Sequence, residues 1–144
     1  MDTTGQYLLG FGIRPSFQRI AIMRYLNHNR THPAADEIFE VLRKQIPTLS
    51  KTTVYNTLKL FVEHGAATYI GIDEKNARFD GHTGPHAHFR CKNCGKIIDL
   101  EMDIEKFLPE DFRGRIDDMQ FYLKGTCEDC NIRGDCAKSI LLKI

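Results

Sequence analysis

The chain has 144 residues, a formal net charge of +1 and 42% hydrophobic residues, which is enough to bury the core of one domain or of two small ones. It contains no apolar run of about 18 residues, the length that a transmembrane helix requires. The residues after Met1 lack the basic start and apolar stretch of a signal peptide. These features argue against a membrane protein, and we expect a cytoplasmic one.

The basic residues are unevenly distributed along the chain. Between Ser16 and Leu60 there are seven Lys or Arg and three Asp or Glu, whereas from Gly81 onward ten basic residues accompany eleven acidic ones. A local basic excess suits a segment that contacts nucleic acid phosphates, although an ordinary solvated surface can carry the same charge. The charge is therefore compatible with DNA binding by the first half of the chain.

Three helices are predicted in this first half, over residues 14–29, 34–45 and 51–64. Ser16 and Ser50 are placed to cap the first and third helices, and Gly65 to end the third. Each segment carries apolar residues at helical spacing. These inner positions are Phe17, Ile20, Ile22, Met23 and Leu26; Ile38, Val41 and Leu42; and Val54, Leu58, Phe61 and Val62.

After Gly65 the pattern changes to that of strands, over residues 67–72 and 77–80, around a polar turn. Three helices followed by a hairpin are typical of a winged helix-turn-helix. Glycine and proline between residues 81 and 85 predict a linker. We therefore expect a winged-helix DNA-binding domain over 1–80, a hinge over 81–85 and a second domain over 86–144.

The second domain is predicted to mix strands with a helix, so the fold class is α/β (α+β). Strands are expected over residues 86–91, 96–100 and 116–124, and a short helix over 104–112. Two Cys-x-x-Cys knuckles, at 91–94 and 127–130, follow the first and last of these strands.

The four cysteines of the two knuckles form the strongest chemical signal in the sequence. A spacing of two residues lets both thiolates of a pair reach one ion in tetrahedral geometry, and soft thiolates favour zinc. A closed shell of four leaves no open catalytic position, so we predict structural Zn²⁺ on Cys91, Cys94, Cys127 and Cys130. Redox-active or free thiols are the alternative. Cys136 is interpreted as an incidental thiol.

A second possible metal site combines imidazoles with carboxylates. His86 and His88 are two residues apart on a predicted strand, so both side chains point to one face. Asp80 and Asp99 supply hard oxygen donors nearby in the sequence, and His32 lies alone in an earlier loop. Such a set suits Fe²⁺ or Mn²⁺ as well as Zn²⁺. From spacing alone, each of these residues could equally be an ordinary loop or strand residue.

Taken together, these stretches closely resemble the ferric uptake regulator (Fur) superfamily over almost the whole chain. The resemblance is carried by residues 16–19 (SFQR), 32–38 (HPAADEI), 50–58 (SKTTVYNTL), 78–80 (RFD), 86–95 (HAHFRCKNCG) and the second Cys-x-x-Cys pair. It implies a metal-dependent transcriptional repressor that is not an enzyme. It further implies a homodimer in which the C-terminal α/β domain dimerises and the winged helices bind double-stranded operator DNA.

The resemblance also implies roles for particular residues. It assigns structural zinc to the four cysteines and a regulatory Fe²⁺ or Mn²⁺ at the hinge to His32, Asp80, His86, His88 and Asp99. The peroxide-sensing PerR branch is similar at all five positions. Iron-sensing members usually carry a further metal site, whose positions are occupied here by residues that are not normal ligands, Pro85, Ala87, Lys106 and Met119. Similarity to the PerR branch implies that bound Fe²⁺ reacts with peroxide and oxidises His32 or His86, which releases the DNA.

DNA contacts are predicted on the third helix, which enters the major groove in such folds. Tyr55 is the leading candidate for a base contact, and Thr52 and Asn56 can hydrogen-bond to bases. Arg19 and Lys51 are expected to hold phosphates.

Three other functions are compatible with parts of the sequence. One is a sensor of iron, zinc or manganese availability. Another is a zinc hydrolase, although no HExxH motif is present and five ligands leave little room for substrate. The third is a thiol redox switch that uses Cys136 or a knuckle.

Overall fold

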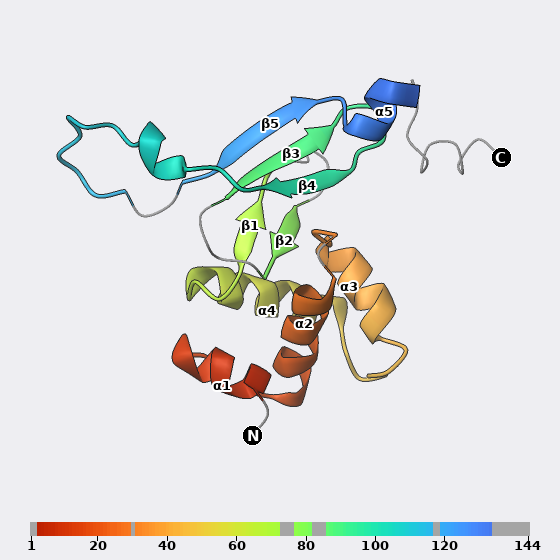
Figure 1. Cartoon of the computed structure of the whole chain (residues 1–144). Helices are drawn as coiled ribbons and strands as arrows, with labels where there is room; N and C mark the ends of the chain where they lie inside the picture. The colour runs from red at the N-terminus through yellow and green to blue at the C-terminus, as the bar shows by residue number, and fades with distance from the viewer. Residues whose placement is uncertain (1–2, 30, 73–76, 82–85, 117–118, 134–144) are drawn as a thin grey trace. The chain divides into compact units, whose positions relative to one another are not determined.

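The computed structural model describes residues 3–29, 31–72, 77–81, 86–116 and 119–133. The chain divides into two compact units, Met1–Thr83 and Gly84–Ile144 (Figure 1). The predicted turn at 73–76, most of the predicted linker and Cys136 lie outside the described residues. The first unit contains α1 (Thr3–Gly10), α2 (Phe17–His28), α3 (Ala35–Leu42), α4 (Lys51–Glu63), β1 (Thr68–Ile70) and β2 (Arg78–Asp80).

The second unit contains β3 (Ala87–Cys91), β4 (Ile97–Leu100), a 3₁₀ turn (Ile104–Phe107), β5 (Phe121–Gly125) and α5 (Glu128–Arg133). The chain therefore mixes helices with two small sheets, as predicted. Among the described residues, no helix is long and apolar enough to cross a membrane.

Serine caps fix the starts of two helices in the first unit. The Ser16 hydroxyl accepts a hydrogen bond from the Arg19 N–H at 3.2 Å, and the Ser50 hydroxyl accepts one from the Thr53 N–H at 3.0 Å. Each bond satisfies a backbone donor that the first helical turn leaves without an intrahelical partner. Gly65, at φ +80°, adopts the left-handed conformation that follows α4. The predicted caps are thus confirmed.

The core of the first unit is formed by one face of each helix. Ile22, Ile38, Leu58 and Phe61 are among its fully buried side chains. Two predicted inner positions were wrong, because Phe17 is 76% exposed and Val41 is 40% exposed. Apolar character at helical spacing does not by itself say which residues the rest of the unit covers: the buried residues of α2 are Ile22, Met23 and Leu26, and those of α3 are Ala35, Ile38 and Leu42.

The N-terminal helix α1 was not predicted, and α3 is shorter than predicted. The segment of α1 contains glycine and is only eight residues long, so it is too short to be stable by itself. Tertiary contacts hold it in place: Leu8 is fully buried, and the Tyr7 hydroxyl donates to the Ala66 carbonyl at 2.8 Å. The α3 helix ends at Leu42, and residues 43–45 form a turn.

The hairpin of the first unit also organises the loop before α3. Strands β1 and β2 pair antiparallel, with Tyr69 opposite Phe79. Ala34 forms an antiparallel bridge with Arg78, and the Phe79 N–H donates to the Pro33 carbonyl at 3.0 Å. The segment before α3 is therefore attached to β2 like a short third strand.

The sheet of the second unit has the order β4-β3-β5 (Figure 1). The central strand β3 is antiparallel to β4 and parallel to β5. Two expectations need correction: the predicted helix 104–112 is only a 3₁₀ turn, and the strand predicted from 116 begins at Phe121. The helix α5, which begins within the second knuckle, was not predicted.

Candidate metal centres and nucleic-acid interface

Four cysteines converge at one end of the sheet in the second unit. Cys91 ends β3, Cys94 lies in the turn before β4, Cys127 precedes α5 and Cys130 lies within it. The parallel register pairs Cys91 with Gly125, so the chain leaving β5 passes next to the first knuckle. Strand pairing therefore brings the four cysteine sulfurs together.

The sulfur positions suit a tetrahedral ion. Four thiolates bound about 2.3 Å from a central Zn²⁺ lie about 3.8 Å from one another. The Sγ atoms of Cys91 and Cys130 are 3.7 Å apart, and those of Cys94 and Cys127 are 3.9 Å apart. All four ligand atoms lie within 4.8 Å of one another. The donors thus match zinc in type, number and spacing.

The electrostatics around the first knuckle favour a thiolate at Cys91. Burial raises the pKa of the Cys91 thiol, but backbone hydrogen bonds near Cys94, Cys127 and Asn93 lower it more, to about 6. One of these donors is the Cys127 N–H, 3.4 Å from the Cys91 Sγ. Burial raises the pKa of Cys94. One sulfur is therefore ready to bind a cation at neutral pH, because the thiolate is the form that ligates metals.

His86, His88 and Asp99 form a second group, here called the β3–β4 cluster. The antiparallel register places His88 directly opposite Asp99. The Nε2 atoms of the two histidines are 2.9 Å apart, and they lie 3.4 and 3.3 Å from the Asp99 Oδ1. Donors bound about 2.1 Å from an ion at right angles are about 3 Å apart. The three ligand atoms therefore have the separations that neighbouring ligands of one metal ion have.

His32 and Asp80 form a separate pair within the first unit. The His32 Nε2 is 3.6 Å from the Asp80 Oδ2, and both side chains are about 2% exposed. The bridge between Ala34 and Arg78 brings the loop of His32 alongside β2, which carries Asp80.

His32 has an unusual backbone conformation. Its φ is +59°, in the left-handed region that residues other than glycine rarely adopt. Backbone strain of this kind costs of order 1–3 kcal/mol and persists where the surrounding structure fixes it. The guanidinium of Arg78 supports the loop by donating to the His32 carbonyl at 3.2 Å. No residue pattern around His32 indicates this conformation.

The helix α4 presents a polar face to solvent. Its buried positions are Val54, Thr57, Leu58 and Phe61, which follow helical spacing. The predicted DNA-contacting residues on this helix are all exposed: Lys51, Thr52, Tyr55 and Asn56. A recognition helix needs exposed side chains on one face to contact base edges in the major groove.

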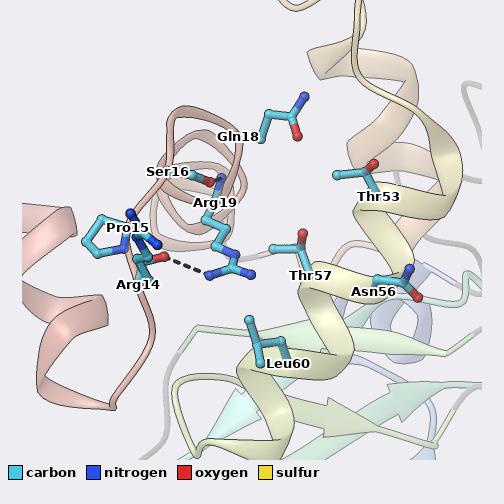
Figure 2. Close-up of a pocket in the computed structure, with 9 residues that line it drawn as sticks. All are labelled: Arg14, Pro15, Ser16, Gln18, Arg19, Thr53, Asn56, Thr57 and Leu60. Atoms are coloured by element: carbon cyan, nitrogen blue, oxygen red, sulfur yellow. Dashed lines mark hydrogen bonds between the residues drawn. The ribbon is translucent and has the colours of Figure 1, made fainter.

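A polar pocket of about 620 Å³ lies between the start of α2 and α4 (Figure 2). Arg19, which was predicted to hold a phosphate, and Asn56 both line it. The Arg19 guanidinium donates to the Arg14 backbone carbonyl at 2.8 Å, which holds the Arg19 side chain beside the segment that enters α2 (Figure 2). Arg14, two residues before the Ser16 cap, also lines the pocket and was not among the predicted DNA contacts. Further lining residues are Pro15, Gln18, Thr53, Thr57 and Leu60.

The fold and these groups define the class of protein: a winged helix-turn-helix protein whose second unit carries a cluster of four cysteines and a histidine–aspartate cluster. The model of the ferric uptake regulator family matches residues 11–120, well over half of the chain. The chain therefore belongs to the ferric uptake regulator family.

Individual relatives agree with this assignment. The peroxide-responsive repressor PerR of Staphylococcus aureus (strain Mu50) is 38% identical over 125 residues, which cover 83% of each chain. A solved structure of PerR from Streptococcus pyogenes, described as a basis for peroxide sensing and gene regulation, is 29% identical. It has a TM-score of 0.50 and covers 87% of this chain and 88% of that one. The ferric uptake regulator of Pseudomonas aeruginosa, solved with manganese, shares the fold at 22% identity. Its TM-score is 0.71, with 88% of this chain and 99% of that chain covered.

Proposed function

We propose that this protein is a metal-dependent transcriptional repressor that senses peroxide. Its metal-bound homodimer binds double-stranded operator DNA, and oxidation of a histidine ligand releases the DNA. The observation that carries the proposal is the β3–β4 cluster, in which two imidazoles and a carboxylate converge with metal-ligand spacing. Similarity to peroxide-responsive repressors supports peroxide as the stimulus.

The two kinds of donor set are proposed to have different tasks. Cys91, Cys94, Cys127 and Cys130 would hold structural Zn²⁺, because their sulfur spacing fits a closed tetrahedral shell. Such a site supplies folding free energy and no chemistry.

The regulatory ion is proposed to take its ligands from His32 and Asp80 together with the β3–β4 cluster. Each group by itself offers two or three donors, fewer than the five or six that Fe²⁺ or Mn²⁺ accepts with nitrogen and oxygen ligands. An ion that needs both groups favours one arrangement of the two winged helices of a dimer over others. Metal binding would then select the shape that matches two DNA half-sites.

On the DNA, Tyr55, Thr52 and Asn56 are proposed to contact bases, and Lys51 and Arg19 phosphates. The support is their exposure along one face of α4 and around the pocket of Figure 2. We further propose that the protein acts in the cytoplasm, where operator DNA is found, and that it regulates transcription without being an enzyme.

Fe²⁺, when bound, would supply the one-electron chemistry that splits the O–O bond of hydrogen peroxide, whereas Mn²⁺ would supply binding without that chemistry. One imidazole, that of His32 or of His86, is proposed to be oxidised by gaining one oxygen atom of the peroxide, and the other oxygen leaves as water. The burial of both side chains shields them from oxidants in bulk solution, so oxidation there requires a reaction that starts at the site itself.

Mass spectrometry of the peroxide-treated Fe²⁺ protein tests this function. We expect a gain of one oxygen atom on His32 or His86, together with loss of DNA binding, and no change in the Mn²⁺ protein. His28 and His64 are exposed and outside both groups, so they serve as internal controls.

Equal oxidation of His28 and His64 would indicate nonspecific damage. No oxidation at any histidine, with iron-dependent DNA binding retained, would instead support a sensor of iron availability.

A further inference from the structure

One carboxylate oxygen on α3 contacts two side chains of α4. The Tyr55 hydroxyl donates to the Asp36 Oδ1 at 3.0 Å, and the Lys51 ammonium lies 3.5 Å from the same oxygen. Lys51 and Tyr55 are one helical turn apart on α4, so a single acceptor can reach both. The Lys51 Nζ is also 5.9 Å from the centroid of the Phe39 ring on α3. The two residues proposed for base and phosphate contact are thus both held by α3.

This arrangement restrains side chains that would otherwise be free to rotate in solvent. Lys51 and Asp36 have side chains that are 55% and 59% exposed, and Tyr55 is 48% exposed. The hydrogen bond to Asp36 is the main reason that the pKa of Tyr55 is raised above its ordinary value. The hydroxyl is therefore bound as a donor to a charged acceptor, a stronger bond than one between neutral groups.

We propose that Asp36 is a positioning residue that sets the sequence specificity of DNA binding. Its carboxylate fixes the orientation of Tyr55 for the base contact and offsets part of the charge of Lys51. The inference rests on the proposed DNA-binding function and adds a residue of α3 to the recognition surface.

Two consequences follow from the chemistry. An anion next to Lys51 weakens attraction to any phosphate backbone, so affinity for arbitrary DNA is reduced. A tyrosine that is already oriented loses less side-chain freedom on binding its proper base, so the correct sequence is favoured. Asp36 thus lowers nonspecific affinity and raises discrimination between sequences.

The test compares variants of the full-length, metal-loaded protein on two duplexes. One duplex is selected from a random pool by the wild-type protein, and the other is a scrambled version of equal length and composition. Asp36→Ala removes charge and acceptor, Asp36→Asn keeps an acceptor oxygen, and Tyr55→Phe removes the donor. Affinities are measured over a range of salt concentrations, with thermal unfolding as a check that each variant folds.

Glu37→Gln is the matched control. Glu37 is also a first-turn acid of α3 with a tyrosine donor, since the Tyr25 hydroxyl lies 3.2 Å from its Oε2. Tyr25 belongs to α2, so this variant removes a similar charge and keeps an acceptor oxygen, as Asp36→Asn does, without affecting α4. It controls for the favourable interaction of first-turn acids with the helix dipole.

We expect Asp36→Ala to reduce the ratio of the two affinities roughly tenfold, as loss of one base contact does. Both Asp36 variants should steepen the salt dependence by up to about 0.9 in the log–log slope, because Lys51 gains a full phosphate interaction. In the Tyr55→Phe background, Asp36→Ala should cause little further loss of discrimination.

An unchanged affinity ratio in Asp36→Ala would overturn the proposal, as would an equal loss in Glu37→Gln. A full additional loss in the Tyr55→Phe background would also overturn it. Failure of the metal-loaded wild-type protein to enrich any duplex would refute the proposed function itself, which keeps the two failures distinct.

Discussion

Replacing Cys94 by serine should unfold the second unit while the first unit stays folded. The variant leaves three sulfurs for an ion whose preferred shell has four, and serine is a poor ligand for zinc at neutral pH. We expect a large loss of stability because the cysteines themselves form the buried cluster of this unit. Its hydrophobic cluster consists of Cys91, Cys127 and Cys130, with Phe89, Cys94 and Ile98 packed against them.

The expected magnitude follows from the small number of other buried side chains. Among the described residues of the second unit, Ala87, Ile97 and Ile104 are the buried apolar side chains other than cysteine. Each contributes roughly 1.5–3 kcal/mol at most. A structural zinc site contributes about 10–16 kcal/mol, comparable to the whole stability of an ordinary domain, about 5–15 kcal/mol. Most of the stability of this unit should therefore depend on the metal.

The assay combines zinc content with amide hydrogen exchange followed by mass spectrometry. In Cys94→Ser we expect zinc loss and rapid exchange in β3, β4 and β5, with α2 and α4 still protected. Chelation of zinc from the wild-type protein should produce the same pattern. Lys92→Ser is the control, because its exposed side chain lies in the same knuckle without contributing a donor atom. Full protection of β3 in zinc-free Cys94→Ser would refute this reasoning.

Four further outcomes are expected. His86→Ala should retain zinc but lose the stimulation of DNA binding by Mn²⁺, measured by fluorescence anisotropy; undiminished stimulation would remove His86 from the regulatory set. Ser50→Ala should destabilise the first unit by about 1 kcal/mol in chemical denaturation, because α4 loses its cap; no change would mean that solvent replaces the serine fully. Lys51→Ala should weaken binding to all sequences and lower the salt slope by about one, whereas a sequence-dependent effect would contradict a phosphate contact. Asp36→Ala should lower the pKa of Tyr55 toward 10, seen by ultraviolet titration. The raised pKa of Tyr55 contributes stability that is fully present below about pH 10 and is lost as the pH rises through the folded-state pKa. The wild-type protein should therefore lose this contribution at alkaline pH, whereas Asp36→Ala, which lacks the shift, should not show this loss.

Local signals in the sequence were sufficient for several features. Ser16 and Ser50 act on backbone groups three residues away, so their capping role depends only on neighbouring residues. The spacing of the cysteines likewise predicted the tetrad of thiols, because two residues between ligands suit a tetrahedral ion. The alternation of His86 and His88 predicted that both imidazoles share one face, because side chains two residues apart on a strand point the same way.

Other features could be decided only by tertiary contacts. The shared acceptor of Tyr55 and Lys51 depends on how α3 packs against α4, and nothing near residue 55 indicates Asp36. The helix α1 is stabilised by the burial of Leu8 in the core of the first unit. Phe17 is exposed because no other element among the described residues covers its side chain, and its residue type does not indicate this.

His32 shows most clearly which properties of a site residue follow from the sequence and which require the tertiary structure. Its identity as a possible ligand was visible from residue type and from resemblance to a family. Its position beside Asp80 requires a bridge from Ala34 to Arg78 and a left-handed backbone at His32 itself. The sequence by itself determined which donors the protein carries, because chemistry belongs to each side chain. The fold alone determined which donors meet, because pairings between distant residues depend on packing that no local pattern records.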